Sequence, residues 1–179
     1  MENVRIGYLA LSKLSWRTAK IDKIAADTGK FLSEQSACSL VQAAGLITSE
    51  AEAEEACAVL NREGIDLLVM HFVTFPAGAL IPLIASRIQV PVVLLANPEE
   101  AGAGKMWEQN SFCGANLGAF VMRRMAKQYG YLKVLPAETP AALHKFIAAA
   151  RCISVLKSRR IGLIGGRVPG FYTSNFDEM

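Results

Sequence analysis

The sequence predicts an α/β fold, in which helices cover both faces of a doubly wound parallel sheet. Two observations predict this class. Nearly continuous apolar runs recur along the chain, as expected of strands that are buried on both faces. Segments with the apolar spacing of helices alternate with those runs. Because right-handed crossovers join parallel strands, the alternation predicts a three-layer α/β/α sandwich of the Rossmann or flavodoxin type.

The apolar runs give the expected strands and a domain boundary. The strands span residues 4–11, 38–47, 65–73, 89–96 and 131–135. A further run, residues 160–164, comes last and opens a glycine-rich turn, which normally leads into a helix and more sheet. We therefore expect residues 1–158 to form an N-terminal α/β domain, and residues 159–179 to be the truncated start of a second, central domain.

The expected helices carry recognisable end signals. They span residues 16–34, 49–62, 77–88, 112–129 and 139–157. Gly64 and Gly130 are expected to end two of them, because glycine tolerates the left-handed conformation of a helix terminus. Gly29 and Pro82 are expected to bend or end the helices that contain them. The expected N-caps are Thr48 or Ser49, Ser111 and Thr139.

Composition narrows the possible functions. The chain has 179 residues, of which 52% are hydrophobic and 20% charged, as in a globular domain. The net charge of +3 comes from scattered residues and not from a basic stripe interleaved with aromatics, so no nucleic-acid partner is expected. No run approaches the ~18 apolar residues of a membrane span, and the N-terminus does not read as a signal peptide. No membrane partner is expected either.

Cysteine spacing and the titratable residues give no complete catalytic or metal site. The four cysteines lie far apart without a CxxC pair, which predicts neither a zinc site nor a disulfide framework. Reduced thiols fit a cytoplasmic protein. No Glu, Asp and His cluster has metal-ligand spacing, and no nucleophile has a paired base. We expect no catalytic residue and no metal ligand in this chain.

Polar residues at the expected strand exits are the candidate ligand contacts, because α/β sheets bind ligands beyond the carboxyl ends of their strands. Arg17 follows the first strand and suits an anion or hydroxyl contact, or a surface salt bridge. His71 suits a hydrogen-bonded histidine at a strand end more than a catalytic base. Sugar contact, or turn and capping chemistry, would explain the polar residues around one loop: Asn97, Asn110, Ser111 and Asn116.

Other motifs favour structural roles. The Gly165-Gly166 pair does not fit the G-x-G-x-x-G spacing of a dinucleotide site. His144 is expected on a solvated helix face, and Cys113 is expected to be a small buried residue. The glutamates of residues 50–55 suit the dipole of a helix start. The small residues between Gly114 and Ala119 predict a helix face for close packing inside the domain.

Three segments, in this order, resemble the N-terminal part of the L-fucose/L-arabinose isomerase superfamily, whose members interconvert aldoses and ketoses. LLVMHFVTFPAGAL, residues 67–80, is similar to a strand and loop of the first domain. MWEQNSFCGANLGAF, residues 106–120, resembles the asparagine-rich loop and small-residue helix of that domain. RIGLIGGRVPGFYTSNFDE, residues 160–178, resembles the strand that starts the central domain. The resemblance covers essentially the whole chain.

The resemblance implies a domain that recognises a monosaccharide and helps to assemble a homo-oligomer, where it covers the active site of a neighbouring subunit. The family holds its manganese ion, Mn2+, with residues of the central and C-terminal domains, so this chain is expected to lack a cofactor and to be catalytically incomplete. Trp16 or Phe75 would pack on a sugar face, and Arg17, His71 and Asn110 would bond hydroxyls. The positions that match the recognition role are Trp16, Arg17, His71, Phe75, Asn110 and Ser111.

A second function fits the same residues. A stand-alone domain could bind or sense a sugar or polyol with these strand-exit loops. Sequence beyond Met179 distinguishes the two hypotheses. A continuing reading frame with Glu, Asp and His metal ligands supports the isomerase, whereas a native stop codon supports the binding domain.

Overall fold

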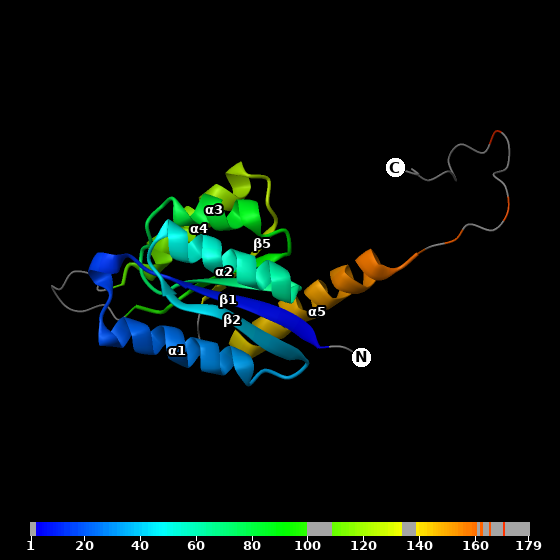
Figure 1. The fold of residues 1–179 in the computed structure, drawn as a ribbon. Coiled ribbons are helices and arrows are strands. Elements are labelled where there is room, and N and C mark those ends of the chain that lie inside the picture. Colours follow the sequence, from blue (N-terminus) through cyan, green and yellow to red (C-terminus); the bar gives the residue numbers. More distant parts are fainter. Residues whose placement is uncertain are drawn as a thin grey trace.

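A five-stranded parallel sheet forms the centre of the structure, a computed structural model. It describes residues 3–99, 109–133 and 139–160, together with Gly162, Gly165 and Gly170. The strand order is β2-β1-β3-β4-β5 (Figure 1). The strands are β1 (Val4–Leu11), β2 (Cys38–Ile47), β3 (Leu67–Phe72), β4 (Val92–Ala96) and β5 (Tyr129–Lys133).

Helices cover both faces of this sheet, which confirms the three-layer α/β/α sandwich (Figure 1). Helices α2, α3 and α4 pack on one face, and α1 and α5 pack on the other. None of these helices, within the described residues, is both long and apolar enough to cross a membrane. The helices are α1 (Ala19–Ser33), α2 (Glu50–Glu63), α3 (Leu80–Arg87), α4 (Ser111–Arg124) and α5 (Thr139–Ser158), with a 3-10 turn, η1 (Leu14–Trp16).

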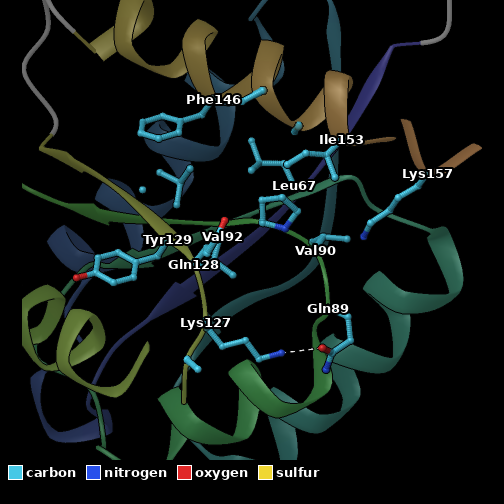
Figure 2. A pocket seen from close by; sticks show the side chains of 16 residues that line it. Leu67, Gln89, Val90, Val92, Lys127, Gln128, Tyr129, Phe146, Ile153 and Lys157 are labelled. Carbon is cyan, nitrogen blue, oxygen red and sulfur yellow. Dashed lines mark hydrogen bonds between the residues drawn. The ribbon is translucent and has the colours of Figure 1, made fainter. Parts of the chain in front are cut away.

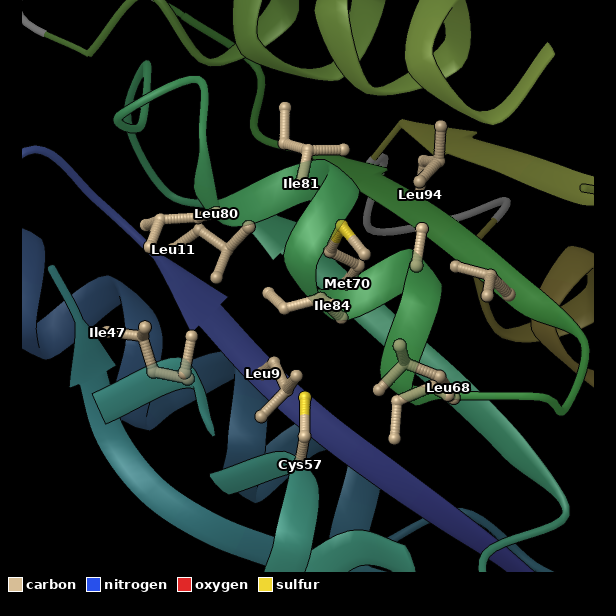
Figure 3. Packing of buried hydrophobic residues seen from close by; sticks show 14 of the residues in the cluster. Leu9, Leu11, Ile47, Cys57, Leu68, Met70, Leu80, Ile81, Ile84 and Leu94 are labelled. Carbon is tan, nitrogen blue, oxygen red and sulfur yellow. The ribbon is translucent and has the colours of Figure 1, made fainter. Parts of the chain in front are cut away.

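The core has two halves because successive residues of a strand point to opposite faces. In β3, Leu68, Met70 and Phe72 pack under α2–α4, where Figure 3 shows the apolar side chains of α3 filling the space above the sheet. Leu67 and Val69 pack on the side of α1 and α5. Burial of each such side chain contributes about 1.5–3 kcal/mol. His71 belongs to the second set by alternation, which places its ring under α1.

The second helix begins and ends as its sequence predicts. Ser49 accepts the N–H of Glu52, and the Glu52 carboxylate accepts the N–H of Ser49, which forms a capping box. These bonds to the carboxylate, led by the N–H of Thr48, lower the pKa of Glu52. Gly64 ends the helix in the left-handed conformation, with φ of 64°. The acidic helix start is therefore structural.

The first helix differs from the sequence prediction at two places. It begins at Ala19 and not at residue 16, because the preceding residues form η1 and Thr18 accepts the N–H of Ile21 as N-cap. Gly29 does not interrupt it. A Cβ at Gly29 would lie 3.0 Å from Gln42 Oε1, so glycine allows α1 to approach the sheet closely.

The boundaries of two further helices differ from the predictions, and α3 spans residues 80–87 and not 77–88. Pro82 does not break α3, since it is the third residue, and the first-turn N–H groups of a helix have no intrahelical acceptor. Asn110, and not Ser111, is the N-cap residue of α4. That helix ends at Arg124, and Gly130 lies inside β5, where a Cβ would overlap the ring of Phe146.

The last helix covers nearly its predicted span, but its predicted N-cap was wrong. Thr139 is the first residue of α5 and not the residue before it, and the helix runs to Ser158, one residue beyond the predicted end. The fifth strand spans residues 129–133 and not 131–135. The predicted strand at residues 160–164 and the second domain expected from residue 159 fall almost entirely outside the described residues.

The small-residue face of α4 packs inside the domain, as predicted. Gly114, Ala115 and Gly118 are buried, and a Cβ at Gly118 would lie 2.5 Å from Cζ of the fully buried Phe72. Helix α4 can therefore lie directly on β3 only because this position has no side chain. Cys113, expected to be buried, is exposed because it lies on the opposite side of α4.

Gly118→Ala tests this close approach. Overpacking costs about 1–3 kcal/mol, and the better helix propensity of alanine recovers up to about 1 kcal/mol. We expect a net loss of about 1 kcal/mol in urea unfolding, which Phe72→Leu in the same chain partly relieves. Gly45→Ala, which meets no atom within 4 Å, is the control. Additive effects of Gly118→Ala and Phe72→Leu would contradict the contact.

Candidate functional site

The carboxyl edge of the sheet is the candidate site. The chain crosses from β1 to β2 on one side and continues to β3, β4 and β5 on the other, so the strand order reverses between β1 and β3. Ligands of α/β sheets bind at such a switch point, outside the carboxyl ends of the strands. The segments that leave these ends begin at Ser12 after β1, Val73 after β3 and Asn97 after β4.

Hydrogen bonds join the strand exits to one another. The N–H groups of Val73 and Thr74 both donate to Leu11 O, at 3.0 and 3.3 Å. The Ser12 and Thr74 hydroxyls are 2.8 Å apart, and the N–H of Lys13 donates to Thr74 Oγ1 at 3.1 Å. These bonds make the exits of β1 and β3 a single unit.

A buried network of hydrogen-bonded side chains, centred on His71, lies directly beneath this edge. The ring is 0% exposed, with Nδ1 2.7 Å from the Tyr8 hydroxyl and Nε2 2.7 Å from Asn97 Oδ1. Asn97 Nδ2 donates to Val73 O at 3.3 Å, which fixes the orientation of the amide. Asn97 Oδ1 can therefore only accept, so His71 Nε2 carries a proton.

Burial keeps the His71 ring neutral, since it lowers the pKa to about 4, against a smaller opposing effect of the Asn97 bond. With the proton on Nε2, Nδ1 accepts the hydroxyl hydrogen of Tyr8. That hydroxyl is also 3.0 Å from Ala25 O of α1, so its hydrogen has two nearby acceptors. Burial raises the pKa of Tyr8, which remains a neutral donor. The chain of bonds thus links α1, β1, β3 and the exit of β4.

Hydrogen bonds of Ser111 hold the start of α4 against the same strand exits. Its hydroxyl accepts the N–H of Asn97 at 2.8 Å and donates to Phe72 O, and its own N–H donates to the carboxylate of Glu99. The residue is 0% exposed. Because both polar groups of Ser111 already have partners, its observed role is to position α4.

The loop after β3 is held from the other side by the segment that leads into α4. Phe75 N–H donates to Gln109 O at 2.9 Å. A Cβ at Gly114 would meet Pro76, Phe72 and the Thr74 carbonyl at 3.1–3.2 Å, so α4 lies tightly against this loop. Gln109 Oε1 is buried and has no hydrogen-bond partner in the described part of the chain.

The six sequence-predicted site residues fall into two layers. Trp16, Phe75 and Asn110 are half-buried at the edge, and Arg17 is exposed there. Arg17 Nε donates to Asp22 Oδ1 at 3.0 Å, a surface ion pair that also orients the guanidinium. His71 and Ser111 lie in the buried layer beneath. Direct sugar contact by any of the six stays a prediction.

Sequence reasoning missed the partners that complete the buried layer. Tyr8 was grouped with an apolar strand, although a buried hydroxyl needs a hydrogen-bond partner. The register pairs Ala10 with His71 and Tyr8 with Val69, two residues apart on the same face of adjacent strands. A tyrosine inside an apolar strand was the available signal, whereas its partner follows from the strand register, which only the structure gives. Thr74 and Glu99 carried no comparable signal, because their partners are backbone and hydroxyl groups of other loops.

The described residues do not form a ligand set for a divalent metal. No three His, Cys, Asp or Glu side chains among them are grouped closely enough to hold an ion. Manganese prefers carboxylate-rich oxygen coordination. At the strand exits, the carboxylate of Glu99 already accepts the N–H of Ser111. The described residues of this edge therefore offer no grouped carboxylates for a manganese ion.

The fold and this edge define an α/β domain with a hydrogen-bonded polar edge at a topological switch point. Comparison with known proteins identifies its family. The model of the fucose/sulfoquinovose isomerase N-terminal domain matches residues 13–157, and the chain belongs to this family.

A curated relative agrees with this assignment. The chain is similar to a sulfoquinovose isomerase of Alkalicoccus urumqiensis, with 30% identity over 114 residues. The matched region is 63% of this chain and 26% of that protein. The family resemblance expected from the sequence is thus confirmed, whereas the match spans only about a quarter of the relative.

The neutral state of His71 predicts a pH dependence. Its pKa of about 4 in the folded protein lies below the ordinary 6.5, so the unfolded chain binds more protons between these values. The free energy of unfolding is therefore fully retained above pH 6.5 and falls as the pH drops toward 4. We expect a loss of about 2 kcal/mol between pH 6.5 and 5, measured by urea unfolding.

Two variants isolate this effect. His71→Gln removes the titrating ring and should flatten the pH profile of unfolding between pH 6.5 and 5, whatever its absolute cost in stability. His144→Gln changes an exposed histidine on α5 and should leave the profile as it is. An unchanged slope in His71→Gln would show that the ring is not buried in its neutral form.

Proposed function

We propose that this chain is the substrate-recognition and assembly domain of a metal-dependent aldose–ketose isomerase of the L-fucose/L-arabinose type. The observation that carries the proposal is the family match over residues 13–157. The polar carboxyl edge supports it, because that edge is where an α/β domain offers groups to a ligand. The activity of the whole protein, the identity of its sugar and its assembly are part of the proposal, since the match covers about a quarter of the curated relative.

The exposed layer of the edge would contact the sugar. Trp16 and Phe75 offer half-buried aromatic faces for the C–H side of a pyranose or open-chain sugar. Arg17, with its guanidinium oriented by Asp22, and Asn110 would bond hydroxyl groups. A hydrogen bond between neutral groups contributes about 0.5–1.5 kcal/mol net, and one to a charged group about 1.5–3 kcal/mol. A few such contacts give weak, millimolar binding by this domain alone.

The buried layer would preorganise those contacts. Because His71 and Asn97 hold the exits of β3 and β4, and Ser111 holds the start of α4, the exposed residues need little reordering when a sugar binds. Preorganisation of this kind retains binding free energy that a flexible loop would lose. In this proposal His71 and Ser111 are positioning residues.

The chemistry of isomerisation would need groups from elsewhere in a complete enzyme. A metal ion there would polarise the carbonyl and hydroxyl oxygens of the sugar. This chain would orient the sugar and exclude water from one side of a neighbouring subunit's active site. The four free cysteines fit the reducing cytoplasm, which is part of the proposal.

Activity measurements test the proposal. We expect the purified 179-residue chain to show no manganese-dependent conversion of L-fucose, L-arabinose or sulfoquinovose, and no micromolar manganese site in calorimetric titration. We expect the complete gene product that contains the chain to convert at least one of these sugars. Conversion by the chain alone would overturn the division of roles.

The alternative binding function predicts different results. A native stop codon after Met179, with micromolar binding of a sugar or polyol by the chain alone, would replace the isomerase proposal. Millimolar binding by the chain, combined with conversion by a longer gene product, would support it.

A further inference from the structure

Helix α5 changes its relation to the domain halfway along its length. Its first half packs on the sheet through Leu143, Ile147 and Ala150. After Ala150, no residue of the helix is buried. Figure 1 shows the last turns of α5 running past the sheet, beyond the amino ends of the strands. The second half of α5 therefore has little contact with the domain to which it belongs.

The side of this second half that faces its own domain carries both polar and apolar residues. Ser154 Oγ donates to Asp66 Oδ1 at 2.8 Å, and Asp66 Oδ2 accepts the N–H of Arg5 at 2.9 Å. Ile153 and Lys157 border a hollow of about 470 Å³ at the amino ends of β3–β5 (Figure 2). These contacts leave every residue of this part of the helix at least partly exposed.

The side of this part of the helix that faces away from the domain carries two apolar residues. Cys152 and Leu156 lie four residues apart, which puts their side chains on one helix face, whereas Val155 borders a hollow with Val4 and Ser39 of its own domain. Leu156 is 69% exposed and the Cys152 thiol is exposed. We call these residues the α5 docking face. A surface helix normally turns its apolar stripe to its own core, whereas Leu156 lies largely in solvent.

The charged residues of α5 indicate which kind of surface is complementary to this face. Residues 139–160 contain no carboxylate, and they contain Lys145, Arg151, Lys157, Arg159 and Arg160. Two copies of α5 packed on each other would bring like charges together, which is destabilising. An apolar patch with an acidic rim is the complementary surface.

The course of the chain shows where such a surface would come from. The family match ends at residue 157, within the last turn of α5. The sequence that follows is rich in apolar residues and ends with Asp177 and Glu178, against Arg167 as its cation after residue 160. In the curated relative, about three quarters of the chain lie outside the matched region. A segment that continues from Ser158 begins next to the docking face, at high effective concentration.

We propose that the α5 docking face binds the domain that residues 159–179 begin, through an apolar patch with an acidic rim on that domain. The inference rests on the proposed function, because it requires a polypeptide that continues past Met179. It adds a specific role for α5, which is to fix the orientation of the sugar-recognition domain relative to the rest of the subunit.

Thiol labelling tests the proposal directly, since Cys152 lies on the docking face. In a Cys113→Ser background, Cys152 is the remaining exposed cysteine, as Cys38 and Cys57 are buried. We expect a maleimide to label Cys152 rapidly in the 179-residue chain, and at least tenfold more slowly in the complete gene product. The control is a thiol introduced by Lys23→Cys, on the exposed side of α1, in a chain without Cys113 and Cys152.

A second variant gives a readout that does not depend on the thiol. Leu156→Lys should leave the urea midpoint of the 179-residue chain unchanged, because Leu156 is largely exposed there. In the complete gene product, the same change should lower the midpoint and restore fast labelling of Cys152. Ser158→Lys, on the side of the last turn that faces the domain, is the matched control and should do neither.

The outcomes separate this inference from the proposed function. Full activity of the gene product with fast labelling of Cys152 would overturn the docking face and leave the function intact. Protection that appears in the 179-residue chain and increases with its concentration would make a second copy the occupant, which would overturn the proposal. A native stop codon after Met179 would overturn both.

Discussion

The hydrogen-bonded chain from Tyr8 through His71 to Asn97 is the constraint on which the carboxyl edge depends. It is buried, so each member needs its partner, and an unpaired polar group there would cost about 1–3 kcal/mol. The neutral imidazole satisfies this condition by accepting from one neighbour and donating to the other. Through Asn97 and Ser111, the same series of hydrogen bonds fixes where β4 ends and where α4 begins.

The packing of α4 against β3 extends this constraint to the residues at the surface of the edge. Helix α4 can reach the strand exits only because Gly114 and Gly118 have no side chain that would hold it away from β3. The loop after β3 is then held between Leu11 on one side and Gln109 on the other. Trp16, Phe75 and Asn110 are thus displayed by loops whose backbone is already fixed. Under the proposed function, this preorganisation would reduce the free-energy cost of binding a small ligand.

The sequence predicted the layers of the fold well, because buried parallel strands are apolar runs that few other structures share. The strand order and the two-layered edge could not be predicted, since they depend on contacts between loops far apart in sequence. His71 shows the difference. Its position at a strand end was visible, but its burial follows from the register of β1 and β3 and from α1 above it. Ser111 was expected as a cap, and it instead bridges two strand exits.

Sugar recognition by the exposed layer of the carboxyl edge is the central claim, and the Michaelis constant of the complete gene product tests it most directly. Arg17→Ala should raise KM for the converted sugar about tenfold, with kcat changed less than threefold, because the lost bond is charge-assisted and binds substrate and transition state alike. Arg62→Ala, which removes an exposed arginine from the end of α2, should change neither. Equal effects of both variants, or an unchanged KM in Arg17→Ala, would contradict the assignment of this edge to the sugar.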